Sequence, residues 1–215
     1  MRIQLIVLAK TPVPGRVKTR LCPPCTPQQA AQVAAAALAD TLDTVTATST
    51  TARVLVVDGD HPAPAGWARV VQRGGPLGER LTHAYADTHV PGMASLLIGM
   101  DTPQVSPALL EEAVDRLSAD RTDAVLGAAE DGGWWALGLR DARHAEVLRD
   151  IEMSTVATGA HTMAALRSRG LRVADLPMLR DVDTAADAHA VAACCPAGSR
   201  FAQAVPRLVP SGMPA

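Results

Sequence analysis

Aromatic residues and long apolar runs are scarce in this sequence. Phe, Trp and Tyr together make up 2% of the 215 residues although 48% of the residues are hydrophobic, so we expect an aliphatic, alanine-rich core. No segment approaches the roughly 18 consecutive apolar residues of a membrane-spanning helix. The apolar segment at residues 3–9 is short for a signal peptide, and cationic residues follow it. We therefore expect a soluble, cytoplasmic protein that does not bind membranes.

An excess of charge of one sign is also missing. Lys and Arg number 20 against 22 Asp and Glu, which gives a formal net charge of -2. Binding to nucleic acid or to an anionic membrane surface usually requires a basic patch or tail, so neither partner is predicted. Small molecules are the partners that remain, and the sequence does not indicate an oligomeric state.

Cysteine is sparse as well, with two clusters in the chain: Cys22 and Cys25, then Cys194 and Cys195. A Cys-x-x-Cys motif in a cytosolic protein can be a redox pair or half of a zinc site. Here two prolines occupy the middle of the motif, and no histidine lies at ligand spacing from either cluster. We therefore expect ordinary reduced thiols.

Apolar segments that resemble strands alternate with segments that resemble helices. Nearly continuous apolar runs such as 3–9 and 94–99 are typical of parallel strands buried on both faces. No internal repeat or linker interrupts the alternation. The sequence therefore predicts a single α/β domain, in which helices flank a mostly parallel central sheet. We expect this domain to span residues 1–195, and residues 196–215 to form a peripheral, proline-punctuated tail.

A carboxylate, Asp101, comes at the carboxyl end of the strand at 94–99, and Pro103 ends regular pairing there. In an open α/β sheet this position faces the crevice in which ligands bind. Mg²⁺ usually takes one or two protein carboxylates together with substrate phosphates, so Asp101 is a candidate metal ligand. Alternatively, Asp101 only caps the helix that begins near Pro107 or shapes a turn.

The loop after the first strand carries four cations within eleven residues: Lys10, Arg16, Lys18 and Arg20. Two prolines and Gly15 give this loop an extended, sharply turned backbone. Cations held near the carboxyl end of a strand form an anion site, in which lysine is a point charge and arginine a bidentate fork. The loop matches neither a Walker A nor a Gly-x-Gly-x-x-Gly motif. It therefore predicts a phosphate site, with a solvated basic loop as the alternative.

The turn Asp131-Gly132-Gly133 is a strong signal for a connection between two strands. Trp134 and Trp135 follow it directly, and two exposed tryptophans would be costly. We expect one of them to pack inward and the other to form a wall beside a binding site. The sequence therefore favours a functional turn over a plain hairpin.

Two further segments allow both a functional and a structural interpretation. Gly75 and Gly78 would let the backbone approach a flat ligand such as a base, or would serve a turn at the start of a helix. Ser154 and Thr155 would bind an anion at a helix N-terminus or would only cap that helix. Both interpretations stay open for each segment.

Late in the chain, Asp181 and Asp183 precede the last expected helix. They are either capping residues or the source of a second carboxylate for a metal at Asp101. Five candidate loops (10–20, 73–80, 101–103, 130–134 and 181–184) thus mostly follow strands. Their convergence at one edge of the sheet would form a ligand site at a topological switch point.

Four ordered motifs, at 9–21, 99–103, 131–139 and 181–184, resemble the rSAM/selenodomain-associated transferase family. That family has the nucleotide-diphospho-sugar transferase fold (GT-A type) and is related to 2-phospholactate and molybdenum cofactor guanylyltransferases. The resemblance implies that the first loop, from Ala9 onward, grips a nucleotide. It also implies two metal ligands, Asp101 and Asp183.

By the same resemblance, Lys18 and Arg20 would neutralise phosphate with the support of Arg16, and Gly78 would lie beside the base. The cofactor implied is Mg²⁺ or Mn²⁺. Asp131 is a candidate catalytic base, together with Lys18 and Asp101 as catalytic residues. The acceptor side would comprise six residues: Asp131, Gly132, Gly133, Trp134, Ser154 and Thr155.

The sequence thus predicts a metal-dependent transferase with a nucleotide-activated donor and a small-molecule acceptor. Glycosyl transfer from a nucleotide-sugar is the reaction that the family resemblance favours. Nucleotidyl transfer from a nucleoside triphosphate to a phosphorylated acceptor, with release of pyrophosphate, is the first alternative. A non-catalytic nucleotide-binding protein of the same fold is the second.

Overall fold

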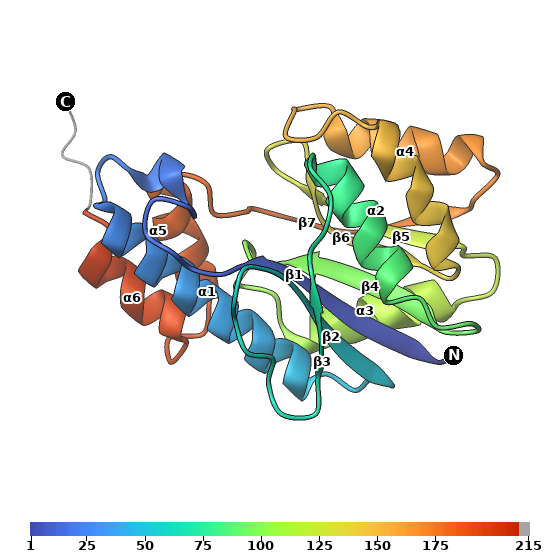
Figure 1. Ribbon diagram of the computed structural model, residues 1–215, viewed down its shortest axis with the longest axis horizontal. Helices are drawn as coiled ribbons and strands as arrows, with labels where there is room; N and C mark the ends of the chain where they lie inside the picture. Colours follow the sequence, from blue (N-terminus) through green and yellow to red (C-terminus); the bar gives the residue numbers. More distant parts are fainter. Residues whose placement is uncertain (211–215) are drawn as a thin grey trace.

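The computed structural model describes residues 1–210 and places a seven-stranded sheet between helices (Figure 1). The strands are β1 Ile3–Lys10, β2 Ala52–Asp58, β3 Ala68–Val71, β4 Ala94–Gly99, β5 Ala124–Ala129, β6 Trp134–Leu139 and β7 Val173–Leu179. Their order is β3-β2-β1-β4-β6-β5-β7. β6 runs antiparallel to β4 and β5, whereas the other paired strands are parallel. The predicted α/β class with a mostly parallel sheet is confirmed.

β1 lies inside the sheet, between β2 and β4, and its residues are apolar on both faces. Leu5 and Val7 pack into the core on one face, and Ile6 packs into the core on the other. Val7 also lies in register with Leu55 of β2 and Ile98 of β4. A strand buried in this way requires helices above and below it.

Helices cover the two faces of the sheet separately (Figure 1). α1 (Pro27–Ala47) and α3 (Pro107–Ser118) pack on the face of Leu5 and Val7. The opposite face is covered by α2 (Leu77–Asp87), the 3-10 helix η2 (Ala142–Asp150) and α4 (Thr158–Ser168). The carboxyl ends of the parallel strands are left between these two layers, where loops rather than helices meet.

Capping residues determine where α1 and α3 begin. The Thr26 hydroxyl accepts a hydrogen bond from the Gln29 N–H at 3.2 Å, and the Gln29 side chain accepts one from the Thr26 N–H at 2.8 Å. Ser106 caps α3 by accepting from the Leu109 N–H at 3.2 Å. The cap of α3 is therefore Ser106, which corrects the alternative in which Asp101 had that role.

Two C-terminal helices, α5 (Ala185–Cys194) and α6 (Arg200–Leu208), pack on the outer side of α1. Phe201 and Val205 of α6 are 0% exposed. The Asp40 carboxylate of α1 also accepts a hydrogen bond from the Phe201 N–H at 2.7 Å. This corrects the expectation of a peripheral tail for residues 200–209, which belong to the folded domain, and residues 211–215 lie outside the described part of the chain.

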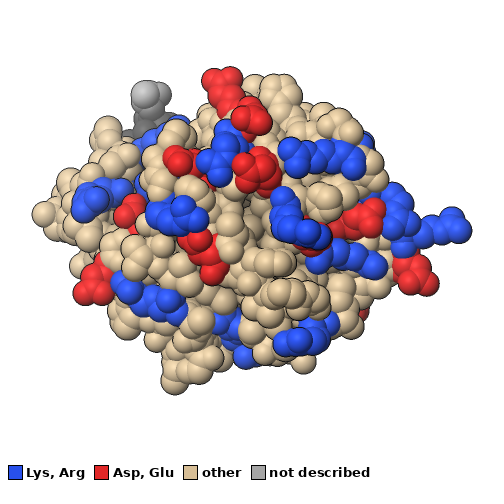
Figure 2. All heavy atoms as spheres, turned by 45° about the vertical axis from the view of Figure 1, so that its right-hand side comes forward, with Lys and Arg blue, Asp and Glu red and all other residues tan. Residues whose placement is uncertain are grey.

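Basic and acidic side chains are interspersed on the face shown in Figure 2, in keeping with the nearly balanced charge of the chain. Among residues 1–210, no helix combines the length and the hydropathy that crossing a bilayer requires. The four cysteines are free thiols, two of them buried, namely Cys25 and Cys195.

Candidate functional site

A cavity of about 510 Å³ opens at the carboxyl edge of the sheet, where the order of strands reverses between β1 and β4. Loops that follow β1, β4, β5 and β7 contribute to its walls, so the predicted convergence of loops occurs. Charged residues of both signs line the cavity. The cations are Lys10, Arg16, Lys18, Arg20 and Arg80, and the carboxylates are Asp101, Asp131, Asp181 and Asp183.

The cationic loop is folded so that Lys18 faces two of these carboxylates. Its Nζ lies 2.7 Å from Asp101 Oδ1 and 3.9 Å from Asp183 Oδ1, and it also donates to the backbone oxygen of Val182. The Lys18 side chain is only 8% exposed. Asp101 and Asp183, which are far apart in the sequence, therefore both lie near Lys18 Nζ, and their predicted role as a pair of metal ligands remains a proposal.

The backbone around Lys18 is held by a short 3-10 helix, η1 (Thr19–Leu21). Lys18 is its N-cap in the left-handed conformation, with φ 48° and ψ 40°, and its carbonyl accepts from the Leu21 N–H at 2.9 Å. Leu21 is fully buried against the C-terminal helices. A non-glycine residue in this conformation is uncommon, and surrounding structure must hold it there.

Arg20 binds the second oxygen of Asp183, with its Nη1 2.7 Å from Oδ2. Unlike Lys18, the Arg20 side chain is 68% exposed. An exposed ion pair of this kind contributes little to stability. It leaves the guanidinium at the mouth of the cavity, where an entering anion can reach it.

The segment 181–183 is anchored through its central residue. Val182 is buried, and its N–H donates to the backbone oxygen of Asp101 at 2.9 Å. In an extended chain alternate side chains point to opposite sides, so the residues on either side of Val182 both face away from the core. Asp181 and Asp183 consequently project into the cavity together.

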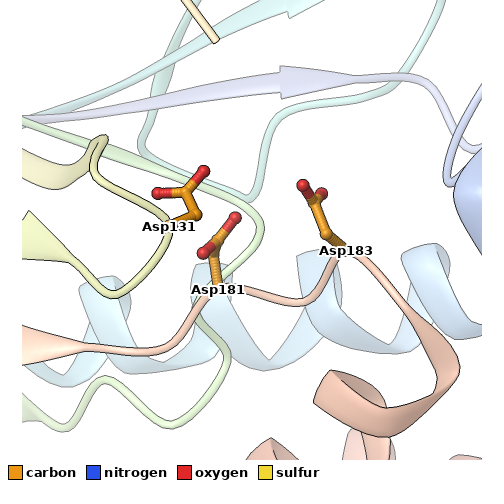
Figure 3. Close-up of side chains that lie close together, drawn as sticks. All are labelled: Asp131, Asp181 and Asp183. Atoms are coloured by element: carbon orange, nitrogen blue, oxygen red, sulfur yellow. The ribbon is translucent and has the colours of Figure 1, made fainter. Parts of the chain in front are cut away.

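Asp131 joins these two residues in a cluster of three carboxylates (Figure 3). One carboxylate oxygen of each residue lies within 4.8 Å of the corresponding oxygens of the other two. Burial, followed by the charges of Asp131 and Asp183, raises the pKa of Asp181 to about 6. Such an oxygen-only, negatively charged donor set fits a hard divalent cation such as Mg²⁺ or Mn²⁺.

The turn that carries Asp131 depends on its glycines. Asp131 Oδ1 accepts from the Gly133 N–H at 2.7 Å, so this side chain shapes the turn as well as facing the cluster. Gly132 has a φ of +90°, and a Cβ there would clash with the carbonyl of Val156. Gly132 itself does not line the cavity of the described chain, although Gly133 does. The acceptor role predicted for Gly132 remains a proposal.

The two tryptophans differ in burial, although both line the cavity. Trp135 is buried, and its Nε1 donates to the Pro177 backbone oxygen at 2.9 Å. Trp134 is partly exposed and forms part of the cavity wall. The alternation follows from the strand geometry of β6, in which successive side chains point to opposite faces.

Ser154 lines the cavity with a φ of 62°, whereas Thr155 does not line it within the described residues. The helix that follows begins at Thr158 with Ala157 as its N-cap, so neither Ser154 nor Thr155 is the N-cap. Thr158 lines the cavity instead, and its hydroxyl accepts from the Thr155 N–H at 3.0 Å. The capping interpretation is therefore corrected, and the acceptor role predicted for Ser154 remains a proposal.

The glycines expected near a base have other tasks. A Cβ on Gly78 would clash with the Leu148 carbonyl, so this glycine permits α2 to pack on η2. Gly75 donates its N–H to the Glu79 carboxylate at 2.8 Å. Within residues 1–210, Gly75, Gly78 and Gly15 do not line the cavity, and the nucleotide contacts predicted for them remain a proposal.

Arg80 and Gln72 line the cavity instead, and sequence reasoning missed both. The Gln72 amide donates to the Ala9 carbonyl at 2.6 Å, and its oxygen lies 3.3 Å from Arg80 Nη1. The predicted residue Ala9 also lines the cavity. The one available signal was the position of Arg80, one turn into the helix that follows the glycine-rich segment.

Comparison with solved structures shows which known proteins share the fold. A protein from Desulfovibrio desulfuricans G20, provisionally assigned as a nucleotide-diphospho-sugar transferase, is 25% identical. Its TM-score is 0.84, and the match covers 96% of this chain and 95% of that one. The chain therefore has the nucleotide-diphospho-sugar transferase fold.

A family model described as an uncharacterized protein conserved in bacteria (DUF2064) matches residues 29–155, and the chain belongs to this family. No curated protein matches the chain.

Two more distant structures share the fold alone. Rv0371c from Mycobacterium tuberculosis H37Rv, in complex with manganese, is 22% identical, with a TM-score of 0.57. The match covers 89% of this chain and 98% of Rv0371c. A cytidylyltransferase from Leptospira borgpetersenii is 9% identical, with a TM-score of 0.59. The match covers 100% of this chain and 99% of the cytidylyltransferase.

Proposed function

We propose that this protein is a divalent-metal-dependent transferase that binds a nucleotide-activated donor through its phosphates. The observation that carries the proposal is the meeting of four carboxylates with Lys18 and Arg20 in one cavity at the topological switch point. Anionic phosphates and a cluster of aspartates repel one another unless a cation lies between them. A site with both is therefore suited to a metal–phosphate complex.

The residues that would hold Mg²⁺ or Mn²⁺ are Asp183 and Asp101, with Asp181 beside Asp183. When bound, the metal ion supplies Lewis-acid stabilisation of charge on the leaving phosphate. Lys18 and Arg20 would bind and orient the remaining phosphate oxygens. The protein's contribution to the rate would then consist of positioning and electrostatics.

Glycosyl transfer is the reaction that we place first. An acceptor oxygen would attack the anomeric carbon, the bond from sugar to phosphate would break, and the nucleoside diphosphate would leave. Asp131 faces the cluster beside Trp134 and is the candidate base for the acceptor proton. The Desulfovibrio neighbour supports this reaction class, and assignment to the rSAM/selenodomain-associated branch is part of the same proposal.

Nucleotidyl transfer is the second candidate. An acceptor phosphate would attack the α-phosphorus of a nucleoside triphosphate, and pyrophosphate would leave. Lys18 and Arg20 in the cavity favour this reaction, because both cations can bind the departing pyrophosphate. The shared fold of the Leptospira cytidylyltransferase is compatible with it.

The products distinguish the two reactions. The protein would be incubated with Mg²⁺ or Mn²⁺, each nucleoside triphosphate and a panel of phosphorylated acids, and assayed for pyrophosphate. A parallel set would contain nucleotide-sugars and be assayed for nucleoside diphosphate. Pyrophosphate release eliminates the glycosyl-transfer proposal, whereas metal-dependent nucleoside diphosphate release supports it. Metal-dependent nucleotide binding that survives Asp101→Ala without any turnover favours the non-catalytic alternative.

A further inference from the structure

Lys18 occupies a position that has the composition of a cation site. Three oxygens converge on its Nζ: Asp101 Oδ1 at 2.7 Å, Asp183 Oδ1 at 3.9 Å and the backbone oxygen of Val182. Two carboxylates and a carbonyl are also ligands that hard divalent cations accept. A metal ion that uses both Asp101 and Asp183 therefore needs the space that the Lys18 ammonium takes.

A second observation places a spare oxygen at the same wall. Thr102 follows Asp101 directly, is 3% exposed and lines the cavity. Its hydroxyl has no hydrogen-bond partner within the described residues. A buried polar group is normally paired, so an unpaired hydroxyl in the wall of a cavity points to a ligand there.

We propose that Lys18 is a latch: its ammonium holds the position between Asp101 and Asp183 until a divalent metal ion binds, and then moves to the donor's phosphates. The inference rests on the proposed function and adds an order of events, in which the metal ion binds first and Lys18 then moves to the phosphates. The loop backbone need not change, because Leu21 and the 3-10 helix hold it, whereas the four-carbon lysine side chain can rotate. Metal binding and phosphate binding are coupled through this one side chain.

Arg20 differs from Lys18 in a way that supplies a control. It contacts Asp183 through Oδ2, the oxygen that does not face Lys18, and it is 68% exposed. Arg20 carries the same charge in the same cavity, but it does not occupy the position between the two acids. Asp131 is the corresponding control among the acids, since it faces the cavity without contacting Lys18.

The first experiment measures binding of inorganic pyrophosphate by calorimetry in the presence of EDTA. We expect Asp101→Asn to tighten this binding at least about tenfold relative to wild type, because the ammonium is released, a change equal to about 1.4 kcal/mol. Asp131→Asn removes the same charge and should have an effect of less than about threefold, on the same scale. The double variant Asp101→Asn/Lys18→Met should lose the gain.

The second experiment measures Mn²⁺ affinity by electron paramagnetic resonance. Lys18→Met should tighten Mn²⁺ binding about tenfold more than Arg20→Met, because only the former vacates the shared position. Equal effects of these two variants would overturn the latch. Equal effects of Asp101→Asn and Asp131→Asn on pyrophosphate, or a gain that persists in the double variant, would overturn it as well.

These outcomes separate the latch from the function on which it rests. Wild type that binds pyrophosphate with Mg²⁺, combined with no specific effect of Asp101→Asn, overturns the latch alone. Wild type that binds neither pyrophosphate nor any nucleotide with Mg²⁺ or Mn²⁺ overturns the proposed function itself. Far-UV circular dichroism verifies that the variants fold. Asp101→Asn keeps the hydrogen bond from the Val182 N–H, because the acceptor is the backbone oxygen of residue 101.

Discussion

Replacing Asp181 with Asn should stabilise the protein at alkaline pH when metal is excluded. Burial and the nearby charges of Asp131 and Asp183 raise the pKa of Asp181 from 3.8 to about 6. The folded state therefore binds the proton more tightly than the unfolded state. The stability linked to that proton is fully present below pH 3.8 and is lost as the pH rises through about 6. Asn carries no charge and avoids this loss.

A difference of about 2 between the pKa values of Asp181 in the folded and unfolded states corresponds to about 2.7 kcal/mol at most. Asp181 is only partly buried, so solvent screening reduces the effect, and we expect about 1 kcal/mol. For a chain of this length this is a rise in Tm of about 2–4 °C. The assay is urea or thermal unfolding of wild type and Asp181→Asn in EDTA at pH 8 and at pH 4.

We expect the free energy of unfolding of Asp181→Asn to exceed that of wild type at pH 8, and this difference to vanish at pH 4. With saturating Mn²⁺ the wild type should be the more stable protein, because it gains binding energy that the variant lacks. A variant that is equally destabilised at both pH values in EDTA would refute the account of the cluster.

Three further predictions concern the scaffold. Gly132→Ala should destabilise by about 2 kcal/mol, measured by urea unfolding, because of its positive φ and the clash of a Cβ with backbone; an unchanged midpoint contradicts this. Phe201→Ala should lower the free energy of unfolding by about 3–5 kcal/mol, since Phe201 is fully buried. No measurable loss of stability would contradict the packing of α6 in the core. Hydrogen bonds from Arg172 lower the pKa of Asp123, so this carboxylate stabilises the fold above pH 3.8, and the contribution is lost as the pH falls. Asp123→Asn should therefore cost about 1 kcal/mol at pH 7 and much less at pH 2 in a pH series of unfolding midpoints.

The sheet and the position of the site could be predicted because a strand that is buried on both faces has a continuous run of apolar residues. Apolar runs such as the one at β1 indicate parallel strands, and polar residues directly after them must lie at one edge. Lys18, Asp101 and Asp183 were placed in one site on this ground, and their ion pairs are compatible with it. Their roles in binding stay proposals.

The partners of individual side chains could not be predicted, because they depend on how distant loops pack. Asp131 meets Asp181 only because β5 pairs with β7, and no local pattern encodes that pairing. The packing of α2 on η2, which requires Gly78, depends on distant contacts in the same way. Proline punctuation obscured α6, although Pro206 lies in the last turn of that helix.

The central claim is that the carboxylates and Lys18 form a site for a metal–nucleotide complex. Its most direct test is a thermal-shift titration of nucleotides and nucleotide-sugars, with and without Mn²⁺, on wild type and Asp183→Asn. The account predicts that at least one nucleotide stabilises wild type by about 2.7 kcal/mol at a hundred times its Kd, only with metal. Asp183→Asn should abolish that shift. Absence of any metal-dependent shift in wild type, or an undiminished shift in Asp183→Asn, would contradict the account.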